Sequence, residues 1–226
     1  MRRTTFDKLL GWIGSLLGIG LLAVGGLLLW GSAYIHNTVQ GQLAAQQITF
    51  PAAAAFAHPQ AGGEITPSMI PSVSQYAGQK LLTGQQAEAY ADHFIAQHIT
   101  DMSGGKTYSQ LSAASMAQPN NTQLAGLVNT VFKGETLRSM LLNAYGWWKV
   151  SQITFIGSLI AFGLAGLVVG YVLAAWQYPR LAAWFEPHLK APWLGEIAGF
   201  LIIFLAVVIA AGILGRIVRW AMKWSA

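Results

Sequence analysis

The sequence predicts an all-α integral membrane protein with three transmembrane helices and a helical extracytoplasmic region between the first and the second. Hydrophobic residues make up 54% of the chain and charged residues only 9%, against roughly 25% charged residues in soluble domains. The apolar residues gather in three long uncharged runs. The sequence between the first two runs carries helix caps and apolar residues at helical spacing, so this region should fold as helices.

The three apolar runs are residues 9–30, 153–176 and 197–215. At about 1.5 Å per helical residue, each can cross a hydrocarbon core of about 30 Å. None contains Asp, Glu, Lys, Arg or His, which argues against a stand-alone pump or secondary transporter, because ion and proton pathways need such groups. The small residues 31–33 leave a cleaved signal peptide open, but the first run exceeds the usual signal core of about 7–15 residues and favours an uncleaved anchor.

Aromatic and basic residues flank the runs, as is typical of the two surfaces of a bilayer. We expect the following side chains at the membrane interface: Trp147, Trp148, Trp176, Tyr178, Trp193, Trp220, Arg216, Arg219 and Lys223. In the second run, three glycines fall close to one helical face and predict close packing against another helix: Gly163, Gly166 and Gly170.

The distribution of charge predicts a lipid bilayer as a partner and argues against nucleic acid. The net charge is +5, but residues 31–148 hold four Lys or Arg and five Asp or Glu, so this region offers no cationic surface to a phosphate backbone. The positive excess lies beside the apolar runs instead, which is the pattern of a multi-pass protein of the plasma membrane.

Basic residues in the segment 1–8 predict a cytoplasmic N-terminus. Three crossings then place residues 31–150 outside, the loop 177–196 inside and the basic amphipathic tail 216–226 outside, against the positive-inside tendency. A re-entrant third run, or a tail lying in the outer interface, would resolve this conflict. The side of the C-terminus therefore stays open.

Residues 31–82 contain several prolines and a glycine pair, which predict an irregular connector. Residues 83–152 should form helices that continue into the second run. Capping boxes begin two of them, at Thr83 with Gln86 and at Thr107 with Gln110; the first should end near 103–105, the second near 116, and residues 122–148 predict one or two more. We expect two apolar faces: Ala87, Ala91, Phe94, Ile95, His98 and Met102 on the first helix, and Leu124, Leu127, Val128, Val131 and Phe132 on the last.

The stretch 88–105, EAYADHFIAQHITDMSGG, holds the strongest candidates for a metal or acid/base site. On a regular α-helix His93 and His98 lie about 140° apart, whereas a zinc-binding pair needs spacing i, i+4. An iron site could still use His98 with Asp101, completed by His36 or His58. Without such a site, His98 packs in a helix contact, and Glu88, Asp92, His93 and Asp101 are solvated.

The chain has no cysteine, which excludes disulfides, zinc–thiolate sites, iron–sulfur clusters and thiol nucleophiles. We assign no catalytic residue, metal or cofactor. The residues left as minority metal candidates are Asp92, His93, His98 and Asp101.

Two blocks, TGQQAEAYADHFIA (83–96) and GETLRSMLLNAY (134–145), resemble a family of small uncharacterised actinobacterial membrane proteins. The resemblance covers roughly residues 6–170 and implies one span, an extracytoplasmic helical region and a second span. Members are sometimes labelled aromatic ring-opening dioxygenases, a label that no residue pattern in this chain supports.

The C-terminal part is similar to the hairpin of the colicin V production protein family. The features that carry this resemblance are Tyr178-Pro179 after the second run and LGRIVR (214–219) at the end of the third. The resemblance implies a role in envelope maintenance or export, and a cytoplasmic tail.

Together, these observations favour a non-enzymatic integral membrane protein whose extracytoplasmic helices bind a membrane or envelope protein partner, or a second copy of the chain. Two alternatives stay open. One is a membrane-bound metalloenzyme using the histidine stretch, and the other is an accessory subunit of a larger membrane complex.

Overall fold

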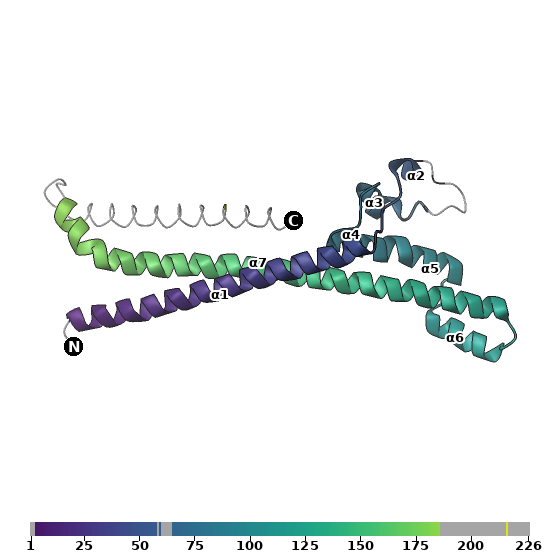
Figure 1. The fold of residues 1–226 in the computed structure, drawn as a ribbon, viewed down its shortest axis with the longest axis horizontal. Helices are drawn as coiled ribbons and strands as arrows, with labels where there is room; N and C mark the ends of the chain where they lie inside the picture. Colours follow the sequence, from purple (N-terminus) through teal and green to yellow (C-terminus); the bar gives the residue numbers. More distant parts are fainter. Residues whose placement is uncertain (1–2, 58, 60–64, 186–215, 217–226) are drawn as a thin grey trace. The chain divides into compact units, whose positions relative to one another are not determined.

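A computed structural model of the chain describes residues 3–57, 59, 65–185 and 216. The chain divides into two compact units. Residues 1–34 and 152–226 form one, called here the apolar unit, and residues 35–151 form the other, the central unit. Two long helices, α1 (Arg3–Ala45) and α7 (Thr122–Phe185), contribute to both (Figure 1).

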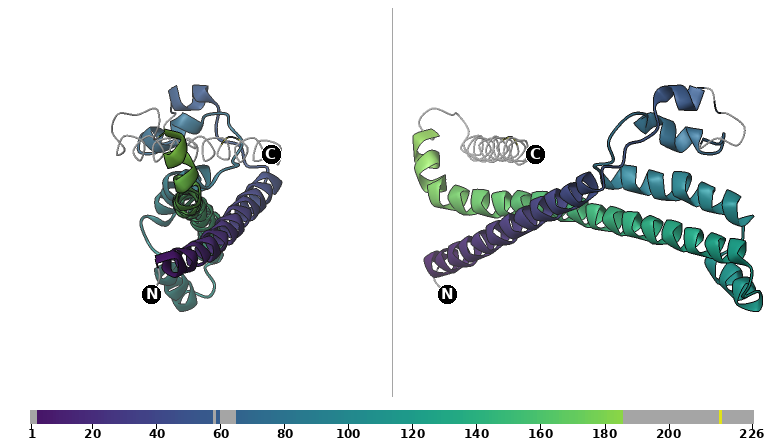
Figure 2. Two further views of the ribbon diagram at one scale, coloured as in Figure 1. Left: turned by 90° about the vertical axis from the view of Figure 1, so that its left-hand side faces the viewer. Right: turned by 45° about the vertical axis from the view of Figure 1, so that its right-hand side comes forward.

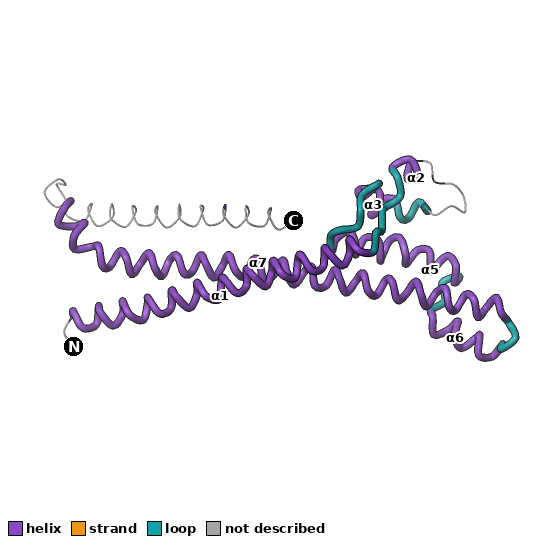
Figure 3. Tube along the Cα trace, viewed as in Figure 1, coloured by secondary structure: helices purple, strands orange, loops and turns teal. Residues whose placement is uncertain are grey.

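The central unit is helical throughout its regular structure (Figure 3). Its shorter elements are α2 (Ala53–Ala57), α3 (Ile70–Val73), the 3₁₀ helix η1 (Ser74–Tyr76), α4 (Gly84–Ala89), the π-helix η2 (Tyr90–Ile95), α5 (Ala96–Ser103) and α6 (Tyr108–Ala117). The described residues contain no strand beyond one isolated antiparallel bridge, Thr49 with Lys80. The all-α prediction is confirmed for this part of the chain.

Both predicted capping boxes are present. The Thr83 hydroxyl accepts from the Gln86 backbone N–H while the Gln86 side chain accepts from the Thr83 N–H, and Thr107 and Gln110 repeat the arrangement. Each box satisfies N–H groups that the first helical turn leaves without partners. The first helix then runs through α4, η2 and α5 to Gly104, which ends it in the left-handed conformation at φ 60°.

The prediction that residues 31–82 form an irregular connector is wrong for residues 31–45, because α1 continues to Ala45. Neither a proline nor a glycine pair interrupts residues 31–45, and Val39 and Leu43 are buried in the central unit.

The expectation of a helix running into the second apolar run is confirmed, since α7 is continuous from Thr122 to Phe185. The first nine residues of the predicted loop 177–196 are therefore helical as well.

In the apolar unit α1 and α7 pack through glycines. A Cβ atom added to Gly14, Gly18 or Gly25 of α1 would lie 2.7–3.0 Å from side-chain atoms of Val172, Val169 and Phe162 of α7. Such contacts let two helices approach closely. Elsewhere on both helices large apolar side chains are exposed, among them Trp12, Leu16, Leu27, Ile153, Ile160 and Leu167.

Two helices among the described residues are long and apolar enough to cross a membrane, within 11–45 and 122–172. Few side chains of their most apolar stretches are buried in the protein. The third predicted run, residues 197–215, lies outside the described residues, as do the rest of the loop and all of the tail except Arg216.

Candidate functional site

The most specific arrangement in the central unit is the contact between the helix 84–103 and α7. The two lie side by side (Figures 1 and 2). Ala87, Ala91, Ile95, Ile99 and Ser103 are buried at strict four-residue spacing. On a regular α-helix such a series drifts about 160° around the axis over 16 residues. The wider turn of η2 offsets part of that drift, so the series keeps facing the core.

This change of register corrects the predicted apolar face. Ile99 is buried, whereas Met102, which was expected on that face, is 47% exposed. On α7, Val131 is buried as expected, but Phe132 is exposed and lies against Tyr108 of α6. Periodicity of 3.6 residues cannot anticipate a π turn, because that turn has its own hydrogen-bond spacing.

Two glycines set the distance between the paired helices. A Cβ atom on Gly84 would overlap the Cβ and Cγ atoms of Trp148. A Cβ atom on Gly134 would lie 2.9 Å from Cδ1 of Ile99. Each glycine therefore receives a buried side chain from the opposite helix. Both belong to the blocks 83–96 and 134–145 that carry the first resemblance.

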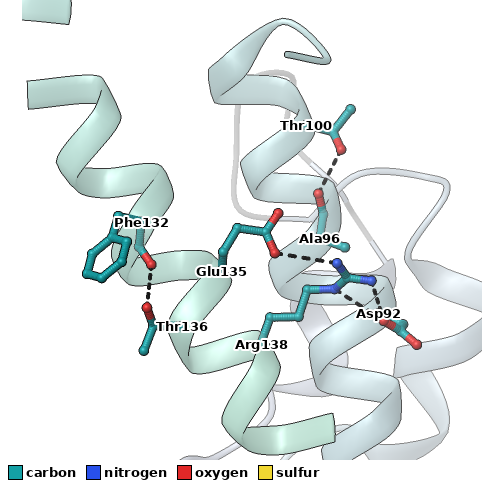
Figure 4. Close-up of polar contacts among 7 residues, drawn as sticks. All are labelled: Asp92, Ala96, Thr100, Phe132, Glu135, Thr136 and Arg138. Atoms are coloured by element: carbon teal, nitrogen blue, oxygen red, sulfur yellow. Dashed lines mark hydrogen bonds and ion pairs between the residues drawn. The ribbon is translucent and has the colours of Figure 1, made fainter. Parts of the chain in front are cut away.

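An ion pair joins the same two blocks (Figure 4). The Arg138 guanidinium donates to Oδ1 of Asp92 from Nε at 3.2 Å and from Nη2 at 2.8 Å, and Nη1 lies 3.5 Å from Oε2 of Glu135. The Asp92 hydrogen bond is the main reason that the pKa of Arg138 is raised, and the two negative charges add to it while partial burial opposes it. Asp92 was expected on a solvated face. Its partner is 46 residues away, so local spacing gives no signal for the pair.

The ring of His36 of α1 lies against that of Trp148 of α7 within the central unit, with ring centroids 4.2 Å apart and the planes tilted by 36°. Burial lowers the pKa of His36 below its ordinary value of 6.5, because a desolvated imidazole resists protonation. The Trp148 Nε1–H is buried without a hydrogen-bond partner in the described protein. This contact is one between two aromatic rings.

The minority metal candidates do not converge. His93 is exposed, while the Nδ1–H of His98 donates to the Phe94 carbonyl at 2.7 Å and its ring packs on that of Phe94. Asp101 accepts from Gln97. The expected separation of about 140° assumed a regular helix, and η2 invalidates that assumption. Even so, no three His, Asp or Glu among the described residues are grouped so that they could hold a metal ion.

The predicted interface residues are only partly described. Trp147 is exposed, but Trp148 is buried, which corrects its assignment to a lipid-facing belt. Successive helical residues point about 100° apart, so only one of the two can face outward here. Arg216 is exposed and helical. Trp176 and Tyr178 lie in α7 without described side chains; Trp193, Arg219, Trp220 and Lys223 are outside the described residues.

The predicted packing glycines differ from one another. Gly163 is exposed, and an added Cβ atom would meet nothing within 4 Å, whereas Gly166 is half-buried and Gly170 is buried. An added Cβ atom on Gly157 of α7 would lie 3.5 Å from Cδ1 of Leu28, and the closer approaches between the two helices are at Gly14, Gly18 and Gly25 of α1. Sequence analysis missed them because glycine is common in apolar runs and spacing alone does not select a face.

These features define a helical protein with two helices of membrane-spanning length and a central unit built on both. Comparison with known families adds a match for its C-terminal part: residues 158–226 match the model of the colicin V production protein family. The predicted resemblance of the C-terminal hairpin is thereby confirmed. The match lies mostly beyond the residues that resemble the actinobacterial family and does not bear on that resemblance. No curated protein and no solved structure matches the chain.

Proposed function

We propose that this chain is a multi-pass plasma-membrane protein of the cell envelope, with α1 and α7 as anchors and the central unit as an extracytoplasmic module that binds an envelope or membrane protein. Its role is of the colicin V production type, in envelope maintenance or export. The match of residues 158–226 to that family is the observation that carries the proposal.

The core of the central unit supports permanent anchoring. Val39 and Leu43 come from α1, and Val131, Leu141 and Trp148 come from α7; all five are buried. Cleavage of a signal peptide after residue 33 would therefore cut a continuous helix just before the residues that it adds to the core. We therefore infer that the first span stays uncleaved and that α1 and α7 both anchor the module.

The site supports binding more than catalysis. Its polar centre is Arg138 held between Asp92 and Glu135, and an arginine paired with carboxylates is a structural tie with no free base or nucleophile. We propose that residues 177–196, which begin with the last nine residues of α7, lie on the inner side, with residues 197–215 as a third span and residues 216–226 as a basic tail.

The proposal is tested in a deletion strain. The full chain should restore growth under envelope stress, such as a detergent or a large antibiotic, whereas a chain ending at residue 157 should not, although both reach the membrane fraction in equal amount. Release of the full chain from membranes by alkaline carbonate would contradict the anchoring. A deletion strain with an unchanged envelope would contradict the role.

A further inference from the structure

One face of α7 in the central unit is exposed and largely apolar. Met140 is 65% exposed, Trp147 53% and Val150 39%, and Asn143 between them is exposed as well. The side chain of Asn143 has no hydrogen-bond partner among the described residues. Together with the half-buried Thr136, these residues are spaced 4, 3, 4 and 3 apart. We call this face the α7 seam.

We propose that the α7 seam pairs with the same seam of a second copy of this chain, in a parallel two-fold dimer. Alternating spacing of three and four is the pattern by which one helix packs along another at a small angle. The pattern therefore fits a helical partner whose axis lies nearly along that of α7 over about four turns.

Lipid cannot cover the whole seam. Met140 precedes the apolar run that begins at Ile153 by thirteen residues, which is about 20 Å along the helix. The headgroup region on each side of a bilayer is only about 5–8 Å thick. Trp147 can lie at the membrane surface, but Met140 and Asn143 lie beyond the lipid. This step rests on the proposed membrane anchoring.

The charge and chemistry of the seam favour an identical partner. In a parallel two-fold helix pair each seam residue lies near its own copy, so a charged residue at the seam would face a like charge. The seam carries no charge, and Arg138 and Glu135 lie on other sides of the helix, where they contact η2 and each other. The Asn143 carboxamide both donates and accepts, so it can pair with itself, and an asparagine at a seam position fixes register and copy number.

Membrane insertion supplies the orientation. Two copies inserted in the same sense carry their α7 helices in parallel. Gly146 and Ser139 flank the seam and are exposed, and an added Cβ atom on Gly146 would meet nothing within 4 Å. Small residues beside the contact leave room for the second helix to approach.

Because the chain has no cysteine, disulfide cross-linking in native membranes tests the seam directly. Single-cysteine variants Met140→Cys, Asn143→Cys and Val150→Cys should each yield a reducible species of twice the monomer mass under mild oxidation. Lys149→Cys is the matched control, exposed on α7 but about 100° from Val150 around the helix. It should stay monomeric.

Equal cross-linking of Lys149→Cys would indicate random collision and would overturn the dimer, and so would monomeric seam variants in the membrane fraction. A cross-linked species of any other mass would assign the seam to a different protein and would also overturn it. Loss of the chain from the membrane fraction would instead contradict the anchoring. As a second measurement, Met140→Glu should halve the protein mass found by light scattering in detergent while its circular dichroism stays unchanged; a dimer that survives Met140→Glu contradicts the seam.

Discussion

Arg138 of α7 donates two hydrogen bonds to one carboxylate oxygen of Asp92 in η2, and this pair fixes the π-helix against α7. We expect the pair to contribute only modestly to stability, because its two side chains are 33% and 34% exposed and solvent screens their attraction. A double-mutant cycle with Asp92→Asn and Arg138→Gln should give a coupling of about 0.5–1 kcal/mol in denaturant unfolding. Glu135→Gln, at a longer contact, should cost less than Asp92→Asn. Additive effects of the two substitutions would show that the pair carries no coupling.

The close approach at Gly84 predicts a large effect from one methyl group. Gly84→Ala should lower the unfolding free energy by about 1–3 kcal/mol, because the added Cβ overlaps the rigid part of Trp148. Gly126→Ala in α7 is the control, since it has no atom within 4 Å and should stabilise the helix by up to about 1 kcal/mol. Equal effects of the two substitutions would mean that Gly84 is not tightly packed on Trp148.

The stability of the central unit should depend on His36 in mildly acidic solution. The folded-state pKa of His36 lies below the ordinary value of 6.5, so the unfolded chain takes up the proton first as the pH falls. The neutral His36 side chain stabilises the folded state fully above pH 6.5. This contribution to the free energy of unfolding is lost as the pH falls towards the folded-state pKa. The thermal midpoint should therefore drop between pH 7.5 and pH 5. In His36→Gln this drop should be smaller, and an identical drop would exclude His36 as its source.

Metal removal should leave the protein unchanged. No three His, Asp or Glu of the described residues form a metal-binding group, and His98 packs on Phe94. Purified protein should contain less than stoichiometric iron or zinc by elemental analysis, and EDTA should not move its thermal midpoint. Stoichiometric metal that disappears in His98→Ala would support the metalloenzyme instead.

Local sequence chemistry was enough to predict where several elements begin and end. Thr83, Thr107 and Gly104 act on atoms within one helical turn, so their roles follow from nearby residues alone. The contacts between elements were beyond such reasoning. Asp92 meets Arg138 across 46 residues, Gly84 meets Trp148, and the π turn that buries Ile99 in place of Met102 arises where the helix packs on α7. The spacing of residues along a regular helix does not reveal contacts between residues far apart in the sequence, and it does not reveal a π turn.

We propose above that the central unit, residues 35–151, lies outside the cytoplasmic membrane. Ser109 is exposed in α6, and a single Ser109→Cys variant can be labelled with a membrane-impermeant maleimide in intact cells. Thr5→Cys, before the first apolar run, is the internal control. We expect Ser109→Cys to be labelled in intact cells and Thr5→Cys to be labelled only after permeabilisation. Labelling of Ser109→Cys only after permeabilisation would contradict it.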